Sequence, residues 1–163
     1  MNKLRNGLNK FTEYLACFIL ATMTVLVTWQ VITRFVFKNP STITEALAKY
    51  LFVWLVLITA AYVIGKREHM AIEFFIGRYS KKVQLIFNTI SEIIILVFVS
   101  IVMTYGGGYI AMNAMSQTDS ALSIPVGIIY LALPVAGILS VFYSICNLAD
   151  IAKKFKELKE ENK

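Results

Sequence analysis

Four long stretches of this sequence are almost free of charge, and they constrain the fold more than any other feature. They are residues 14–33, 46–65, 83–108 and 126–149. Only Lys49 and Glu92 are charged within them. About 20 helical residues, at about 1.5 Å each, cover the hydrocarbon core of a bilayer, which is about 30 Å thick. Backbone groups inside a membrane must hydrogen-bond within their own segment, so such spans are helices. The sequence predicts an all-α integral membrane protein.

The chain of 163 residues is predicted to form one membrane domain, residues 1–163. The predicted segments are spans at about 14–37, 45–65, 83–106 and 125–149, a basic loop at 66–82 and a tail at 150–163. Apolar residues make up 58% of the chain and charged residues 16%. This balance excludes a disordered chain, a disulfide scaffold and most soluble enzymes.

The basic residues predict the direction of the spans. Thirteen of the 16 Lys and Arg residues lie in segments 3–10, 66–82 and 153–163. These segments alternate with pairs of spans, and basic residues in short loops mark the cytoplasmic side. Both termini are therefore predicted to be cytoplasmic. Charge at the ends of spans also argues against a basic face for nucleic acid, so no nucleic-acid partner is expected.

Two segments have the pattern of amphipathic helices that lie on a membrane surface. Leu4, Leu8 and Phe11 recur at helical spacing among basic residues, which predicts a short interfacial helix before the first span. Residues 69–79 predict a second interfacial helix, with a loop packed under the bundle as the alternative. The three glycines at 106–108 are expected to loosen or end the third helix.

Charges near the ends of the first two spans suggest an ionic cluster. Arg34 and Glu45 flank a short loop and are expected at the same depth, and Lys49 follows Glu45 by one helical turn. We predict an Arg34–Glu45–Lys49 cluster that ties the two helices together. The alternative is that the two basic side chains extend separately to lipid phosphates.

Glu92 is predicted to lie about 15 Å along its helix from Lys82, near the middle of the membrane. A carboxyl group there is costly and is expected to have a partner. Two roles are open: a proton-coupling carboxylate, or a structural group that is hydrogen-bonded to a neighbouring helix of this or another chain. The lack of a second acidic residue at that depth favours the structural role.

The last span carries a stripe of small residues that permits close helix approach. Its members are Ala132, Ala136, Ser140 and Ser144. We predict a structural or partner-interface role for Ala136 and Ser140. Trp54, like Trp29 and most tyrosines, is expected to anchor a span near an interface or at a partner.

The sequence contains no motif that indicates an enzyme. Cys17 and Cys146 are expected to be inert buried thiols, and His69 is the only histidine, so no zinc site is predicted. Nucleotide-binding and nucleophile motifs are absent. We therefore expect no catalytic residue, no metal and no cofactor.

Several segments, in order along the chain, form a recognisable set: residues 45–54 continuing to 60–62, Val31 with Arg34 and Phe35, Glu68 with His69, and residues 120–125 with Tyr130 and Pro134. Together they resemble one family of membrane proteins, the DctQ-like small subunits of tripartite ATP-independent periplasmic (TRAP) transporters. One departure is Thr44, where the family often has a second acidic residue beside Glu45.

The resemblance implies a small permease subunit in a bacterial cytoplasmic membrane. In that family, a large multi-spanning subunit holds the substrate and sodium sites and moves in an elevator fashion, and a periplasmic binding protein delivers an organic acid. C4-dicarboxylates, 2-oxo acids and sialic acid are typical substrates. The small subunit resembles a fixed scaffold in contact with lipid.

Two other classes of function stay open from the residues alone. One is a self-contained, homo-oligomeric, proton-coupled transporter that uses Glu92. The other is a membrane anchor for a cytoplasmic enzyme. The sequence shows no internal repeat of the kind that many self-sufficient secondary transporters carry, which favours a subunit of a larger machine.

Overall fold

The computed structural model describes residues 2–39, 41–66 and 80–161, and every element in these ranges is helical. The elements are α1 (Asn2–Phe35), α2 (Thr42–Lys66), α4 (Lys81–Phe98), the π-helical segment η1 (Val99–Gly106), α5 (Gly107–Ala114), α6 (Gly127–Tyr130) and α7 (Ala132–Glu161). Four helical segments are long and apolar enough to cross a membrane: Leu4–Phe35, Thr42–Lys66, Lys81–Ala114 and Gly127–Glu160. The predicted all-α class and the four apolar helices are confirmed.

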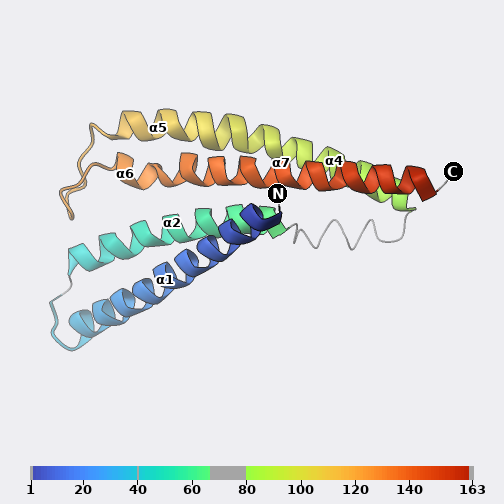
Figure 1. Ribbon diagram of the computed structural model, residues 1–163. Helices are drawn as coiled ribbons and strands as arrows, with labels where there is room; N and C mark the ends of the chain where they lie inside the picture. The colour runs from blue at the N-terminus through green and yellow to red at the C-terminus, as the bar shows by residue number, and fades with distance from the viewer. Residues whose placement is uncertain (1, 40, 67–79, 162–163) are drawn as a thin grey trace.

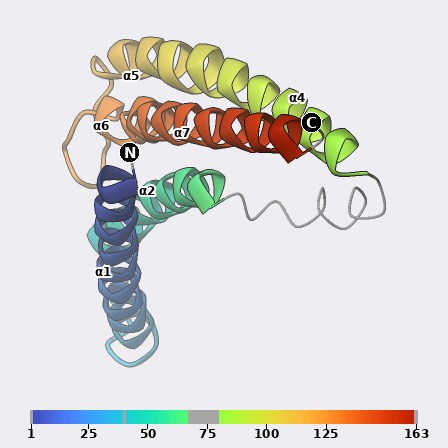
Figure 2. The ribbon, with the colours of Figure 1, turned by 45° about the vertical axis from the view of Figure 1, so that its right-hand side comes forward.

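The helices form two antiparallel pairs, α1 with α2 and α4–η1–α5 with α7 (Figure 1). Contact between α2 and α7 joins the two pairs. The α1–α2 and α5–α6 connections lie at one end, which we call the turn side. The last turn of α2 and the C-terminus lie toward the other end, the terminal side. From there α1 diverges from α7 toward the turn side (Figure 2).

Helix α1 corrects one expectation from the sequence. It is continuous from Asn2 to Phe35, so the predicted separate interfacial helix at its start is wrong. No proline interrupts this segment, and one glycine within a helix costs only about 1 kcal/mol. The apolar stripe that begins at Leu4 and Leu8 lines a groove beside α7. The second predicted interfacial helix, at 69–79, lies outside the described residues.

The glycine run also behaves differently from its prediction. The third span loosens into π-helical geometry at η1 but continues through all three glycines to Ala114. Helix packing accounts for this continuity, because a Cβ atom on Gly107 would lie 2.7 Å from Cβ of Leu133 on α7. Close approach recurs at Gly137, where an added Cβ would lie 2.5 Å from Oγ1 of Thr104. These contacts hold the third span against α7 beyond the glycines, which were expected to loosen or end it.

The small-residue stripe lies inside the bundle. Ala132, Ala136, Ser140 and Ser144 have at most 1% of their surface exposed. Ser140 donates its hydroxyl to the carbonyl of Ala136 at 2.8 Å, so its polar atom is satisfied within α7. Ala136 and Ser140 therefore pack against helices of this chain and have no surface left for a second protein.

Candidate functional site

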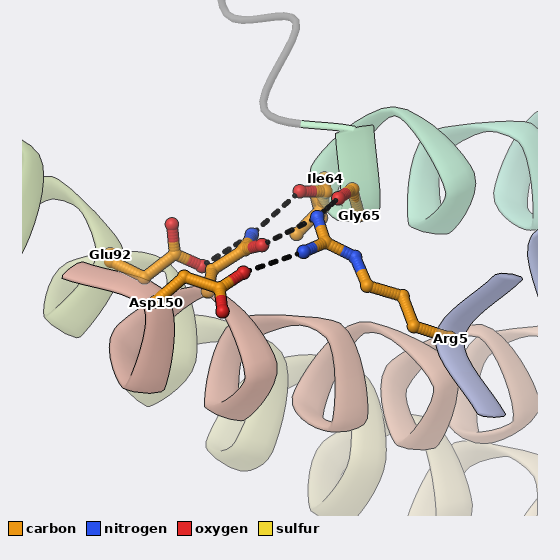
Figure 3. A network of polar contacts seen from close by, with 6 residues as sticks. Arg5, Ile64, Gly65, Glu92 and Asp150 are labelled. Atoms are coloured by element: carbon orange, nitrogen blue, oxygen red, sulfur yellow. Dashed lines mark hydrogen bonds and ion pairs between the residues drawn. The ribbon is translucent and has the colours of Figure 1, made fainter. Parts of the chain in front are cut away.

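A network of polar contacts joins all four spans at the terminal side (Figure 3). We call it the polar clamp; it consists of the side chains of Arg5, Glu92, Asn147 and Asp150 and the backbone carbonyls of Ile64 and Gly65. Arg5 of α1 donates to Asp150 Oδ2 at 2.8 Å and to Asn147 Oδ1 at 3.0 Å, both on α7. It also donates to the carbonyl of Gly65. One guanidinium thus bonds to two other helices.

Asn147 extends the clamp to the remaining helix. Its Nδ2 donates to the carbonyl of Ile64 at 3.0 Å and to Oε1 of Glu92, on α4, at 3.3 Å. The two carbonyls belong to the last turn of α2, where helical C=O groups lack partners within the helix. Donors from Arg5 and Asn147 satisfy them, and the positive guanidinium lies at the negative end of the α2 dipole.

Sequence reasoning found only part of this clamp. Glu92 is 7% exposed and bonds to a neighbouring helix of the same chain, as its structural role requires. Glu92 lies level with the last turn of α2, because the Asn147 amide bonds both to it and to the carbonyl of Ile64. Its depth in the membrane stays a prediction. The role of Arg5 was missed because it was treated as a topology signal. Asn147 and Asp150 could have been found as polar residues spaced three apart at the end of an apolar span.

The predicted cluster at the turn side is only partly present. Lys49 Nζ lies 2.7 Å from Glu45 Oε1, within α2. Arg34 is exposed, and its guanidinium carbon lies 5.8 Å from the ring centre of its neighbour Phe35. Among the described residues, no ion pair includes Arg34. The ion pair therefore stays within one helix, and Arg34 acts on Glu45 only through a weaker Coulombic attraction.

A different residue links α2 to the loop between α5 and α6, which contains Asp119 and which we call the turn-side loop. The Tyr50 hydroxyl donates to Asp119, and this hydrogen bond lowers the pKa of the carboxyl group. The backbone N–H groups of Leu122 and Ala121, each 2.9 Å from Asp119 Oδ1, lower it further. The sequence had not singled out Asp119, although an aspartate that bonds N–H groups two and three residues ahead is a common turn signal.

Two apolar grooves flank α1. The first, the α1/α7 groove, has a volume of about 540 Å³ and is lined in part by Phe11, Leu15 and Ile19 of α1, Trp54 of α2, and Ile138 and Leu139 of α7. A further apolar hollow of about 500 Å³, which shares Phe11, Ile138 and Leu139, continues it toward Leu4. The second, the α1/α2 groove, has about 740 Å³ and includes Cys17, Val56 and Ala60.

The surroundings of the two cysteines do not indicate a catalytic or metal-binding role. Cys146 is buried, as expected, but Cys17 is exposed on α1, so its predicted burial is wrong. Within the described ranges, no three His, Cys, Asp or Glu side chains gather as metal ligands would. The polar groups that do gather form the clamp, which joins helices.

Comparison with known proteins identifies the family of this chain. The family model for the DctQ component of tripartite ATP-independent periplasmic transporters matches residues 23–154, which is most of the chain. The chain belongs to this family. It is therefore a small permease component of a TRAP transporter, a multi-pass membrane protein of a bacterial transport system, and not an enzyme. Membership implies association with a large permease.

Three relatives support the assignment. The chain is 28% identical over 153 residues to the sialic acid TRAP transporter small permease protein SiaQ of Vibrio cholerae, covering 94% of this chain and 88% of that protein. It is 29% identical over 140 residues to a putative TRAP transporter small permease protein of Haemophilus influenzae, covering 85% and 86%. It is 32% identical over 136 residues to the sialic acid TRAP transporter permease protein SiaT of Haemophilus influenzae, covering 83% of this chain and 22% of that protein.

Proposed function

We propose that this chain is the fixed, non-catalytic scaffold of a sodium-driven TRAP importer of an organic acid. In this proposal it supports a large, elevator-type permease subunit in the bacterial cytoplasmic membrane, and a periplasmic binding protein delivers the substrate. Sialic acid is the first substrate to test, because two of the relatives carry it in their names. C4-dicarboxylates and 2-oxo acids are the next classes.

The observation that supports a scaffold is the polar clamp. It joins all four helices through one arginine and one asparagine. Breaking such contacts inside a membrane protein is costly, so the four helices are expected to move as one body. The grooves along α1 and α2 are apolar, and a polar hollow lined in part by Lys81, Lys154 and Glu157 lies at the terminal ends of α4 and α7, not along the spans. An organic anion and a sodium ion that cross a membrane need polar ligands. The substrate path is therefore expected in the large subunit.

The orientation forms part of the proposal. Lys66, Lys81 and Lys82 lie on the terminal side, as do the basic residues near both termini. Because basic residues mark the cytoplasmic side, we place both termini in the cytoplasm and the turn side in the periplasm. The turn-side loop that contains Asp119 is then available to the binding protein.

Reconstitution tests this function. The chain, its large permease and the binding protein are placed in liposomes, and sialic acid uptake is followed with and without an inward sodium gradient. We expect uptake only with all three proteins and the gradient. The matched control omits this chain alone. Uptake by this chain without the large permease, or undiminished uptake in its absence, would contradict the proposal.

Glu92→Gln distinguishes the scaffold from a Glu92-dependent carrier. Glutamine keeps a carbonyl oxygen that can accept the hydrogen bond from Asn147 but cannot carry a proton. We expect assembly and uptake to stay close to those of the native complex. Complete loss of uptake with normal assembly would assign the carboxyl group a role in coupling and would reject the purely structural role.

A further inference from the structure

We propose that the polar hollow at the terminal ends of α4 and α7 binds the headgroup of a phospholipid that carries both a phosphate and a primary ammonium group. Lys81 and Lys154 hold the phosphate. Glu157 and Glu160 hold the ammonium group. The inference requires only that the chain spans a membrane, so it stands or falls independently of the proposed scaffold role.

The hollow, which we call the α4/α7 hollow, lies where the first turns of α4 meet the last turns of α7 (Figure 1). Its volume of about 710 Å³ lies within the range of about 300–1,000 Å³ for pockets that hold small ligands. Side chains of both helices line it, among them Lys81 and Asn88 of α4 and Lys154, Glu157 and Glu160 of α7. It differs in this from the grooves along α1, which are apolar.

The charges that line the α4/α7 hollow balance, because two lysines face two glutamates. Lys154 and Glu157, three residues apart on α7, could have paired with each other. Among the described residues, however, the ion pairs are those of Arg5 with Asp150 and of Lys49 with Glu45, and neither includes a residue of the hollow. A hollow with balanced charges fits a zwitterion better than a net anion, which the carboxylates would repel.

The charges also follow an order along the helix axes. The bond between Asn147 and Glu92 places these two residues at one level of the antiparallel helices. From that level, Lys154 lies about 10 Å toward the terminal side, Lys81 about 16 Å and Glu160 about 20 Å, at about 1.5 Å per residue. In a phospholipid the phosphate is attached to the glycerol and the ammonium group extends beyond it. A lysine nearest the membrane and a glutamate farthest from it match this order.

The position of the hollow favours a lipid over a soluble phosphate ester. Its charged residues lie just outside the apolar parts of α4 and α7, where basic side chains meet lipid phosphates. Leu85 and Leu158 line the hollow beside the charges, and Ile86 next to Leu85 is 49% exposed. The glycerol and acyl chains of a lipid can cover this apolar surface, whereas a soluble headgroup cannot.

Native mass spectrometry of the full chain in detergent tests the headgroup. The chain is mixed with equal amounts of phosphatidylethanolamine, phosphatidylcholine and phosphatidylglycerol that carry the same acyl chains. All three contain the phosphate, but the choline group has no N–H donor and the glycerol group has no positive charge. We expect phosphatidylethanolamine to be retained roughly threefold to fivefold more than either of the others. A preference for phosphatidylglycerol, or equal retention of all three, would overturn the proposal.

The phosphate contact has a matched pair of variants on one helix. Lys154→Ala removes a lysine that lines the hollow, and Lys153→Ala removes its exposed neighbour, which does not. We expect Lys154→Ala to retain roughly fivefold less phosphatidylethanolamine, the effect of one basic residue near a lipid phosphate, and Lys81→Ala to do the same. Lys153→Ala should retain as much as the native chain. Equal retention by Lys153→Ala and Lys154→Ala would remove the hollow as the binding site.

The ammonium contact predicts a change in preference. The double variant Glu157→Gln, Glu160→Gln removes two negative charges and leaves the lysines of the hollow in place. We expect it to retain more phosphatidylglycerol than phosphatidylethanolamine, which a mere loss of stability would not produce. Glu13→Gln, which changes an exposed glutamate of α1, should keep the native preference. An unchanged preference in the double variant would overturn the role of the two glutamates.

Competition separates a lipid from a soluble ligand with the same headgroup. Soluble phosphoethanolamine is added to the native chain in a hundredfold excess over bound phosphatidylethanolamine. We expect the lipid to stay bound, because the soluble compound lacks the glycerol and acyl chains. If phosphoethanolamine displaces the lipid, the hollow is a site for a soluble phosphate ester, and the proposed lipid is wrong.

Discussion

The two ends of the α1–α2 pair are held by different kinds of polar contact. At the terminal side, Arg5 bonds across to α2 and α7, and Glu13 accepts a hydrogen bond from Tyr62 of α2 at 3.3 Å. At the turn side, Lys49 pairs with Glu45 one turn away in its own helix, and Arg34 lies over the ring of its neighbour. Among the described residues, side-chain hydrogen bonds and ion pairs join α1 to the other helices at the terminal side alone, so α1 is anchored there.

Arg5→Ala is expected to have the largest effect on this contrast. It removes the donors to Asp150, Asn147 and the Gly65 carbonyl, and it leaves partly buried acceptors unpaired. We expect a loss of about 2–3 kcal/mol in the free energy of unfolding, less than for a fully buried pair because Arg5 retains some exposure. Thermal unfolding of the purified chain in detergent measures it.

Lys10→Ala is the matched control for Arg5→Ala. Lys10 is also a basic residue on the first turns of α1, but its side chain is exposed. We expect the free energy of unfolding of Lys10→Ala to change little. Equal losses for both variants would show that the clamp adds no stability beyond that of a surface charge.

Gly65→Ala is expected to have the next largest effect. A Cβ atom there would lie 2.6 Å from Cδ1 of Tyr143, whose side chain is fully buried. The ring would have to shift, and the α2 carbonyls would move away from Arg5 and Asn147. We expect a loss of about 1–2 kcal/mol in the free energy of unfolding, measured in the same way.

Gly108→Ala provides the comparison, because nothing lies within 4 Å of a Cβ atom at that position. Alanine is the better helix former, so we expect an unchanged or increased stability, by up to about 1 kcal/mol. A loss at Gly108 as large as that at Gly65 would contradict the tight packing assigned to Gly65 against Tyr143.

Features within a single helix could be predicted from the sequence, and contacts between helices could not. The four apolar helices follow from segment length, and the Glu45–Lys49 contact follows from spacing within one helix. The clamp depends on the axial offset between neighbouring helices. Residue spacing within one segment does not specify that offset. For this reason the sequence could not show that Glu92 lies level with the end of α2, and Arg5 was read only as a topology signal.

The turn-side loop is expected to respond to acid. Since hydrogen bonds in the folded state lower the pKa of Asp119, its carboxylate stabilises the fold at a pH above its ordinary pKa of 3.8. That stabilisation is lost as the pH falls from there through the lowered folded-state value. Tyr50→Phe removes the first of these hydrogen bonds. We expect its melting temperature to lie below that of the native chain at pH 7, and the difference to shrink in acid.

Tyr105→Phe is the control for that titration, because Tyr105 is 78% exposed. It should leave the melting temperature unchanged at every pH. If the difference in melting temperature between Tyr50→Phe and the native chain grows as the pH falls, the proposed direction of the pH dependence is wrong.

The smallest effect is expected at Arg34. This residue tests the turn side, where the polar contacts of α1 are weaker than at the terminal side. Within the described residues Arg34 forms no ion pair, so Arg34→Glu should leave the free energy of unfolding nearly unchanged. Glu45→Arg should lose only the exposed contact with Lys49. Combining the two variants should then restore little, because within the described residues Arg34 and Glu45 form no ion pair and attract each other only weakly. Thermal unfolding of the two single variants and the double variant measures the coupling. If the double variant is clearly more stable than the sum of the single changes predicts, an ionic contact joins α1 to α2 at the turn side, and α1 is anchored at both ends.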